Sequence, residues 1–198
     1  MWGRTQVNMA FFLREIGYKG YIVSFEPVRS VYDELQGKCA KDDKWFCYNF
    51  ALGNKQEEKM LNVYQSTDFS SFLKANTYSK KTWKGLSHVT PEKVKVFKLD
   101  DKYNEIIKVL GCTNHMLKMD TQGYDKFVFD GAINCLQDIS VIQSELSLIS
   151  VYEKMLGAYD ILKEFHENKF YISGMYPINR DESLAVIEYD CVLVRKLF

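Results

Sequence analysis

The sequence has little that would point to a membrane or a nucleic acid. Lys and Arg number 26 and so do Asp and Glu, which leaves no net charge to attract nucleic acid or an anionic membrane. No apolar run reaches the roughly 18–20 residues of a membrane helix, and the first residues lack the basic, apolar and small-residue order of a signal peptide. We therefore expect a protein without nucleic-acid or membrane partners.

Patterns typical of metal sites and disulfide frameworks are also missing. The five cysteines are scattered and odd in number, and none stands in a C-x-x-C pair, which argues against zinc ligation and a disulfide frame. His115 and His166 have no partner at metal-ligand spacing, and we expect the loop residue His88 to be solvated. A reduced, cytoplasmic protein without a metal is the simplest expectation.

The sequence does have the composition and patterning of a globular α/β protein. Hydrophobic residues make up 46% and charged residues 26% of the chain, and its 198 residues suit a single domain spanning residues 1–198. Short β-rich runs alternate with segments of helical spacing. The expected strands are residues 21–25, 45–52, 60–64, 93–99, 117–119, 139–146, 170–173 and 189–194. The expected helices are residues 10–16, 28–35, 103–110, 124–136 and 152–165.

Glycine and proline mark several expected helix boundaries. Gly17 stands where the C-cap glycine of the first helix would be, and Pro27 fits the first turn of the second helix, which Gly37 is expected to end. No strand precedes the first helix. The chain therefore begins one element later than a doubly wound domain normally does.

Three carboxylates stand at the expected carboxyl ends of parallel strands. Glu26 follows the run at 21–25, Asp120 leads from its strand into a Thr-Gln-Gly turn, and Glu145 lies near the end of the run at 139–146. Open α/β sheets bind ligands outside these ends, where an acidic residue commonly accepts hydrogen bonds from ribose hydroxyls. We expect the three carboxylates to lie side by side along one rim.

Each of these residues also has a structural alternative. Glu26 could be an exposed loop residue, Asp120 could cap the following helix, and Glu145 could be a structural hydrogen-bond partner. For Lys118, an ion pair with a neighbouring carboxylate is favoured over a catalytic role.

The segment from Ser66 to Pro91 is the least regular part of the chain. It is rich in Ser, Thr, Lys and aromatic residues and shows little periodicity. A stretch of this length inside a compact domain is often a functional loop, so we expect residues 66–91 to form a lid or an acceptor-binding insertion.

Seven short motifs, in order, resemble those of the FkbM-type branch of the class I S-adenosylmethionine-dependent methyltransferases. They are Phe25-Glu26-Pro27, Ala51-Leu52-Gly53, Leu99-Asp100, Lys118-Met119-Asp120-Thr121-Gln122-Gly123, Gly131-Ala132, Ile142-Gln143-Ser144-Glu145 and Asp190 to Arg195. Single triplets are weak, but seven in the right order and spacing are specific, and they cover the chain from about Gly17 onward.

The resemblance implies a Rossmann-like sheet that is mostly parallel and ends in an antiparallel strand pair. It implies an O-methyltransferase that uses S-adenosyl-L-methionine on a hydroxyl of a sugar or small metabolite, with a small-molecule or glycan acceptor. Asp120 and Glu145 would be the catalytic residues, Asp120 being favoured as the base or acceptor-orienting group. The implied cofactor-binding residues are Gly3, Glu26, Pro27, Ala51, Leu52, Asp120, Gln122 and Gly123.

The chain departs from the family pattern in two places. Asp125 stands where the family usually has a glutamate, one methylene longer. The glycine motif before the first helix falls on Met1 to Val7, where only Gly3 fits, and the preceding strand is absent, so the domain is expected to be N-terminally truncated. Loss of a central strand would leave unpaired backbone groups, and loss of the glycine turn would remove a close backbone approach to the cofactor. We therefore expect weak cofactor binding or none.

Two other functions stay open at this point. A non-catalytic methyltransferase-like module for binding or assembly would explain the altered glycine motif, and pairing with another chain, for instance in a homodimer, could fill the place of the missing strand. A nicotinamide-binding Rossmann domain would need a G-x-G-x-x-G between strand and helix, which the sequence does not contain.

Overall fold

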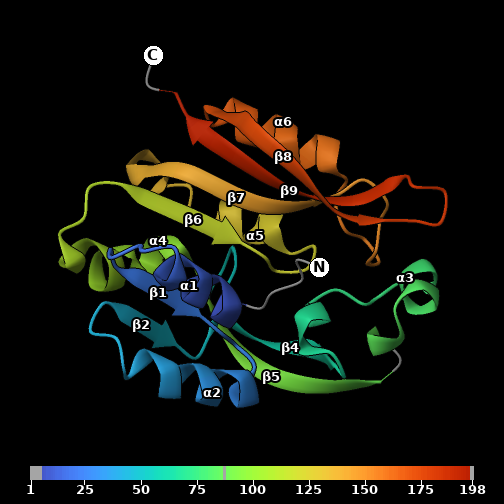
Figure 1. Cartoon of the computed structure of the whole chain (residues 1–198), viewed down its shortest axis with the longest axis horizontal. Coiled ribbons are helices and arrows are strands. Elements are labelled where there is room, and N and C mark those ends of the chain that lie inside the picture. Colours follow the sequence, from blue (N-terminus) through green and yellow to red (C-terminus); the bar gives the residue numbers. More distant parts are fainter. Residues whose placement is uncertain (1–5, 87, 197–198) are drawn as a thin grey trace.

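The computed structural model describes residues 6–86 and 88–196, a mixed α/β chain with parallel and antiparallel strands (Figure 1). The strands are β1 (Ile22–Phe25), β2 (Trp45–Tyr48), β3 (Ala51–Leu52), β4 (Glu57–Tyr64), β5 (Val89–Phe97), β6 (His115–Met119), β7 (Ile139–Ser147), β8 (Phe170–Arg180) and β9 (Val186–Arg195). The α-helices are α1 (Gln6–Glu15), α2 (Arg29–Cys39), α3 (Thr77–Thr82), α4 (Leu99–Lys102), α5 (Asp125–Asp130) and α6 (Ala158–Glu167). Single 3-10 turns cover Thr67–Phe69, Lys84–Leu86, Lys108–Leu110 and Leu136–Asp138, and a π-helical turn covers Tyr103–Ile107.

The described strands form three hydrogen-bonded sheets. β1 pairs with β2 in parallel, β3, β5 and β4 form a second sheet in that order, and β6, β7, β9 and β8 form a third. In Figure 1 the β6–β7 pair lies between the β8–β9 pair on one side and β1, β2, β4 and β5 on the other. The expected antiparallel pair at the C-terminal end is confirmed, because β9 runs antiparallel to both β7 and β8. The expected mostly parallel sheet is not found among the described strands, whose pairings are parallel in three cases and antiparallel in three.

The main hydrophobic core lies around the four-stranded sheet. Buried side chains from β6, α5, β7, α6 and β9 pack together there, among them Met119, Phe129, Ile142, Phe165 and Leu193. A second, smaller cluster joins β4, the loop before α3, the loop after β7 and the start of β9 through Tyr64, Ala75, Val151, Tyr152 and Ile187. This second cluster anchors residues 66–86 against the rest of the molecule.

The first helix ends as its glycine predicts. Gly17 has a φ of +89°, which an L side chain rarely adopts. Its N–H donates to Arg14 O, and the N–H of Tyr18 donates to Leu13 O, so the two bonds form a Schellman motif. The Arg14 guanidinium then ties this turn to Asp42, 2.6 Å away.

Other helix boundaries differ from the predictions. Pro27 precedes α2 by two residues, and Gly37 does not end α2, which continues to Cys39. The helix expected over 124–136 stops at Asp130 and continues as turns, and the helix expected from Tyr152 begins only at Ala158. In both cases the apolar residues have helical spacing but their backbone forms turns or loops. Tertiary contacts bury these side chains without a regular helix.

Two glycines from separate motifs meet in the fold. A Cβ on Gly131 would lie 1.9 Å from the carbonyl oxygen of Gly53, so only glycine fits at this crossing. The carbonyl of Gly131 accepts a hydrogen bond from the N–H of Asp100, and the Asp100 carboxylate accepts bonds from the backbone N–H groups of Asn134 and Cys135. The Ala51-Leu52-Gly53, Leu99-Asp100 and Gly131-Ala132 motifs therefore hold α5 and the following turns against β3.

No helix in the described part of the chain is long and apolar enough to cross a membrane.

Candidate functional site

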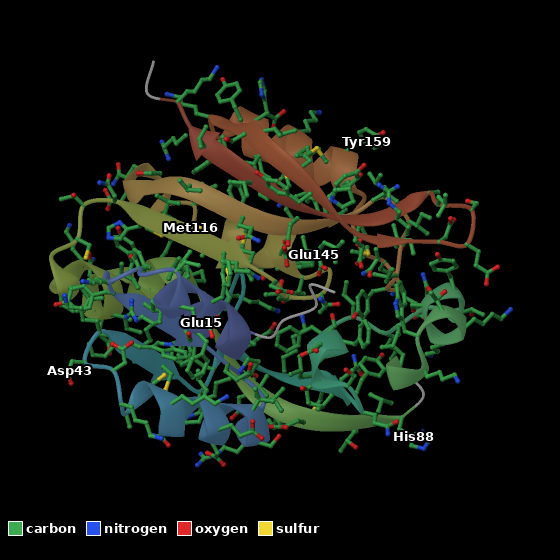
Figure 2. All side chains as sticks on the ribbon, in the orientation of Figure 1. Glu15, Asp43, His88, Met116, Glu145 and Tyr159 are labelled. Carbon is green, nitrogen blue, oxygen red and sulfur yellow. The ribbon has the colours of Figure 1, made fainter. Side chains whose placement is uncertain are left out.

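Gln122 lies at the centre of a polar network at the carboxyl ends of β6 and β7. Its Nε2 donates to Glu145 Oε2 at 2.8 Å and to Asp120 Oδ1 at 3.3 Å. Its backbone has a φ of 52°, and the next residue, Gly123, has a φ of 82°. A non-glycine residue in this conformation is held by its surroundings, a feature that clusters at functional sites. The structure thus brings Asp120, Gln122 and Glu145 together, and Figure 2 shows Glu145 in the middle of the molecule.

The carboxylate of Asp120 is paired with a lysine from the same strand. Lys118 Nζ donates to Asp120 Oδ2 at 2.7 Å, which confirms the ion pair expected for Lys118. Burial disfavours the charge on Lys118, but Asp120, Asp190 and Glu145 together outweigh it, and the pKa of Lys118 is raised above its ordinary value. Asp120 does not cap α5 in the structure, because the residue at that position is Tyr124.

Asp125 fixes the turn between β6 and α5 to the neighbouring strand. Its buried carboxylate accepts hydrogen bonds from the N–H of Thr121 at 2.9 Å, the hydroxyl of Thr121, the hydroxyl of Ser144 at 2.7 Å and the N–H of Glu145 at 3.2 Å. Burial raises the pKa of Asp125, and the hydrogen bonds from Thr121 and Ser144 oppose that rise. The Asp125 carboxylate thus orients both the Asp120-containing turn and the Glu145 backbone.

Glu145 lies among several other acidic groups. Burial is the main reason that its pKa is well above the ordinary range, and the charges of Asp120 and Glu188 raise it further. Glu188 is itself buried, and its carboxylate accepts hydrogen bonds from Ser147 at 3.0 Å and Asn179 at 2.9 Å. The site therefore holds one carboxylate beside a cation, Asp120, and one whose pKa is raised by burial and neighbouring charges, Glu145.

Two further residues of the network did not stand out in the sequence. The Tyr152 hydroxyl lies 2.9 Å from Gln122 Oε1 and 2.9 Å from the carbonyl oxygen of Phe69, and its proton can be donated to either. Ser71 Oγ donates to the backbone oxygen of Gln122 at 2.7 Å. Tyr152 was expected in a helix and Ser71 in an irregular segment, and only their distant partners show that both hold Gln122.

Glu26 directly follows the last residue of β1. Among the described strands, β1 is hydrogen-bonded only to β2. Its Oε1 accepts a hydrogen bond from the N–H of Val28 at 2.8 Å, and its backbone oxygen accepts one from Asn49. Burial raises the pKa of Glu26 to about 7, and the charge of Glu92 adds to the rise. Among the described residues, hydrogen bonds through Gln122 join Asp120 and Glu145, but none joins Glu26 to either, and β1 belongs to a different hydrogen-bonded sheet from β6 and β7.

The other predicted cofactor-binding residues lie in varied surroundings. Pro27 follows Glu26, and Asn49 Nδ2 donates to its carbonyl oxygen at 3.2 Å. Ala51 and Leu52 form β3, with Ala51 buried and Leu52 packed against the main core. At Gly123 an added Cβ would meet Met155, Leu73 and Tyr152 within 3.0–3.4 Å. Gly3 lies outside the described residues.

Histidine and cysteine contribute no metal centre to the part of the chain that the structure describes. No group of three or more His, Cys, Asp and Glu side chains there is arranged to hold a metal ion. His115 Nδ1 instead lies 3.0 Å from the Tyr103 hydroxyl and 2.9 Å from the Asp138 carbonyl oxygen.

The methyltransferase FkbM domain model matches residues 3–172. Neither a curated protein nor a solved structure is significantly similar to the chain. The matched region includes β1 to β7, Glu26 and the whole Asp120–Gln122–Glu145 network. Because the match spans most of its length, the chain belongs to the FkbM methyltransferase family.

Proposed function

We propose that this protein is an S-adenosylmethionine-dependent O-methyltransferase that acts on a hydroxyl of a sugar or small metabolite. The observation that carries the proposal is the hydrogen-bonded link from Asp120 through Gln122 to Glu145 at the ends of two parallel strands. Ligands of open α/β sheets bind outside such strand ends. The backbone conformation of Gln122 and the raised pKa of Glu145 are both features that cluster at active sites.

The fit to the cofactor rests on Glu26. One oxygen of its carboxylate is taken by the Val28 N–H, and no partner for the other is found among the described residues. That oxygen suits a ribose hydroxyl, and Ala51 and Leu52 would lie near the adenine. Asp120 and Gln122 would lie beside the methionine end of the cofactor and the acceptor. When bound, the cofactor supplies an electrophilic methyl group on a sulfonium.

Asp120 and Glu145 would have different roles toward the acceptor hydroxyl. Asp120, which lies 2.7 Å from the Lys118 ammonium, would accept a hydrogen bond from the hydroxyl and orient its oxygen. Glu145 has a raised pKa, so once deprotonated it is a stronger base and can receive the proton. A base of this kind contributes typically about 10²–10⁴-fold to the rate. Gln122 would keep the two carboxylates in fixed positions.

A methyl-transfer screen tests this proposal. The purified chain is incubated with isotopically labelled S-adenosylmethionine and a panel of glycans and small hydroxylated metabolites, and products are identified by mass spectrometry. We expect a methylated product that is lost with Asp120→Asn and retained with Asp43→Asn, a change at an exposed residue. A product that forms equally with Asp120→Asn would contradict the assigned role of Asp120.

The second candidate is a non-catalytic binding or assembly module of the same family. It is favoured because β1 pairs with β2 alone among the described strands, whereas in a Rossmann-like sheet another strand would lie between β1 and β6. Calorimetric titration with S-adenosylmethionine separates the two candidates. Micromolar affinity supports the enzyme, whereas absence of binding together with absence of any methylated product supports the module.

A further inference from the structure

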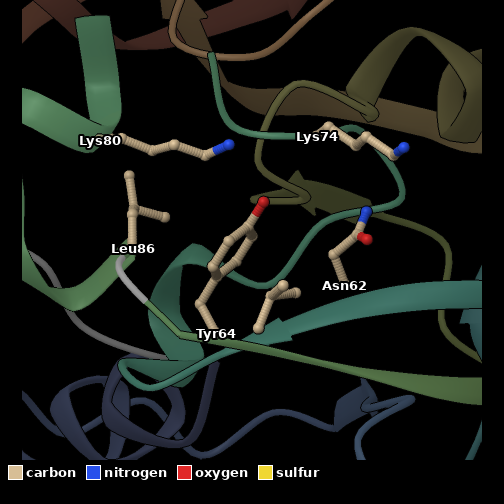
Figure 3. A pocket seen from close by; sticks show the side chains of 6 residues that line it. Asn62, Tyr64, Lys74, Lys80 and Leu86 are labelled. Carbon is tan, nitrogen blue, oxygen red and sulfur yellow. The ribbon is translucent and has the colours of Figure 1, made fainter. Parts of the chain in front are cut away.

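A cavity lies between β4 and the segment that follows it. Its volume is about 370 Å³, and it is lined by Asn62 and Tyr64 of β4, Lys74, Lys80 of α3, Leu86 and Val89. Figure 3 shows the side chains of Lys74 and Lys80 above the strand, with the ammonium of Lys80 directed toward the Tyr64 hydroxyl and that of Lys74 over Asn62. Four of the six lining residues belong to the segment 66–91, where the sequence predicts a lid or acceptor-binding insertion.

The polar groups of this cavity are mainly hydrogen-bond donors. Lys74 and Lys80 are exposed, and no ion pair is found for either among the described residues. Tyr64 is only 4% exposed, and its hydroxyl oxygen accepts the N–H of Ala75 at 2.9 Å, so its own proton is left to be donated. No Asp or Glu lines the cavity. The cavity therefore has two ammonium groups and a hydroxyl donor, and no carboxylate lines it. These groups favour the binding of an anion.

The cavity is connected to the network around Gln122 through shared residues. Asn62 Nδ2 donates to the carbonyl oxygens of Ser71 and Leu73, and Ser71 Oγ in turn donates to the backbone oxygen of Gln122. Leu86 lines this cavity and also a much smaller one that Gln122 and Tyr152 border. A ligand in the larger cavity would therefore touch the same segment that holds the polar network in place.

We propose that this cavity binds an anionic group, a phosphate or a carboxylate, on the acceptor molecule. The proposal rests on the methyltransferase function proposed above and adds that the acceptor is acidic as well as hydroxylated. Lys74 and Lys80 would contact the oxygens of the anion as point charges, and Tyr64 would donate a hydrogen bond. An acidic sugar, either a sugar phosphate or a sugar carboxylate, combines the required anion with hydroxyl groups.

Calorimetric titrations at low ionic strength test the proposal without cofactor or turnover. The probes are glucose 6-phosphate, glucuronate and glucose, so the first two distinguish a phosphate from a carboxylate. We expect at least one anionic probe to bind tenfold or more tightly than glucose. The double variant Lys74→Gln/Lys80→Gln should lose that preference by tenfold or more. Because binding alone is measured, the outcome is independent of whether methyl transfer takes place.

The matched control is Lys81→Gln/Lys84→Gln. It removes the same charge from exposed residues in the same segment that do not line the cavity, and it should keep the preference for the anion. Thermal unfolding of both double variants shows whether they fold equally well. The proposal is overturned if neither anionic probe binds more tightly than glucose, or if the two double variants lose affinity equally.

Discussion

The side chain of Gln122 donates a hydrogen bond to the carboxylate of Glu145, with 2.8 Å between Nε2 and Oε2. The two residues come from different strand ends, 23 positions apart in the sequence. The amide can make this contact because the backbone of Gln122 adopts a positive φ, and Tyr152 and Ser71 hold that conformation from two other segments. The geometry of the site therefore depends on contacts among four parts of the chain.

Replacing Gln122 with glutamate should weaken the fold in a pH-dependent way. The new side chain would present an acceptor to two carboxylates in place of a donor, and an ionised glutamate would repel both. We expect a loss of about 1–3 kcal/mol in the free energy of unfolding at pH 8 and a smaller loss at pH 5, where the new carboxyl can be protonated and donate. Urea unfolding at both pH values measures this. Gln36→Glu on the exposed side of α2 is the control, and equal effects of the two changes would contradict the role of Gln122.

Asp125→Asn should destabilise the protein although it keeps the size of the side chain. Its Oδ1 accepts from Thr121 and its Oδ2 accepts from the Ser144 hydroxyl and the Glu145 N–H, and an amide nitrogen cannot accept on one of these sides. A buried donor left unpaired costs about 1–3 kcal/mol, so the midpoint of urea unfolding should fall accordingly. Asp43→Asn, on the exposed surface, should stay within about 0.5 kcal/mol of the unchanged protein. If Asp125→Asn were equally harmless, the carboxylate would not be holding the turn.

Two glycine-to-alanine changes should have opposite effects on stability. At Gly131 a Cβ would collide with the Gly53 carbonyl oxygen at 1.9 Å, and because the obstacle is backbone we expect a loss of at least about 2 kcal/mol. At Gly37, inside α2, nothing lies within 4 Å of an added Cβ, and alanine should stabilise the helix by about 0.5–1 kcal/mol. Unfolding by urea or heat measures both. A tolerated Gly131→Ala would show that α5 and β3 can move apart.

The raised pKa of Glu26 makes a prediction about pH. The folded protein binds the proton of Glu26 up to about pH 7, whereas the unfolded chain releases it near the ordinary value of 4.5. Between these values the folded state holds more protons, so the contribution of Glu26 to stability falls as the pH rises, by at most about 3 kcal/mol. Glu26→Gln keeps an acceptor for Val28 and removes this loss, so its advantage over the unchanged protein should grow from pH 5 to pH 8.

Thermal unfolding at several pH values measures the effect of Glu26→Gln. The exposed residue Glu15, labelled in Figure 2, supplies the control change Glu15→Gln. Glu145 has a pKa raised in the same direction, so part of the pH dependence should persist in Glu26→Gln. A difference between Glu26→Gln and the unchanged protein that stays constant from pH 5 to pH 8 would contradict the proposed burial of a protonated Glu26.

The local pattern of the sequence determined most of the strands and their order. Alternating and continuous apolar runs predict β4 to β7 and the closing strands β8 and β9, because side-chain period and burial follow directly from backbone geometry. Gly17 predicts the end of α1 because only glycine adopts its backbone conformation without strain. The order of short motifs predicts the family, and the FkbM domain match confirms it. The ion pair of Lys118 with Asp120 could also be predicted from the sequence, because the two residues lie at the same strand end.

The tertiary structure alone decided which residues meet. Tyr152 and Ser71 contact Gln122 from segments far apart in the sequence, and Asp125 contacts Ser144 on the neighbouring strand, and no local pattern records such contacts. The split between the β1–β2 pair and the β6-containing sheet likewise depends on which backbone groups find partners in space. Sequence periodicity reports whether a side chain is buried, whereas a hydrogen bond between distant residues exists only once the chain has folded.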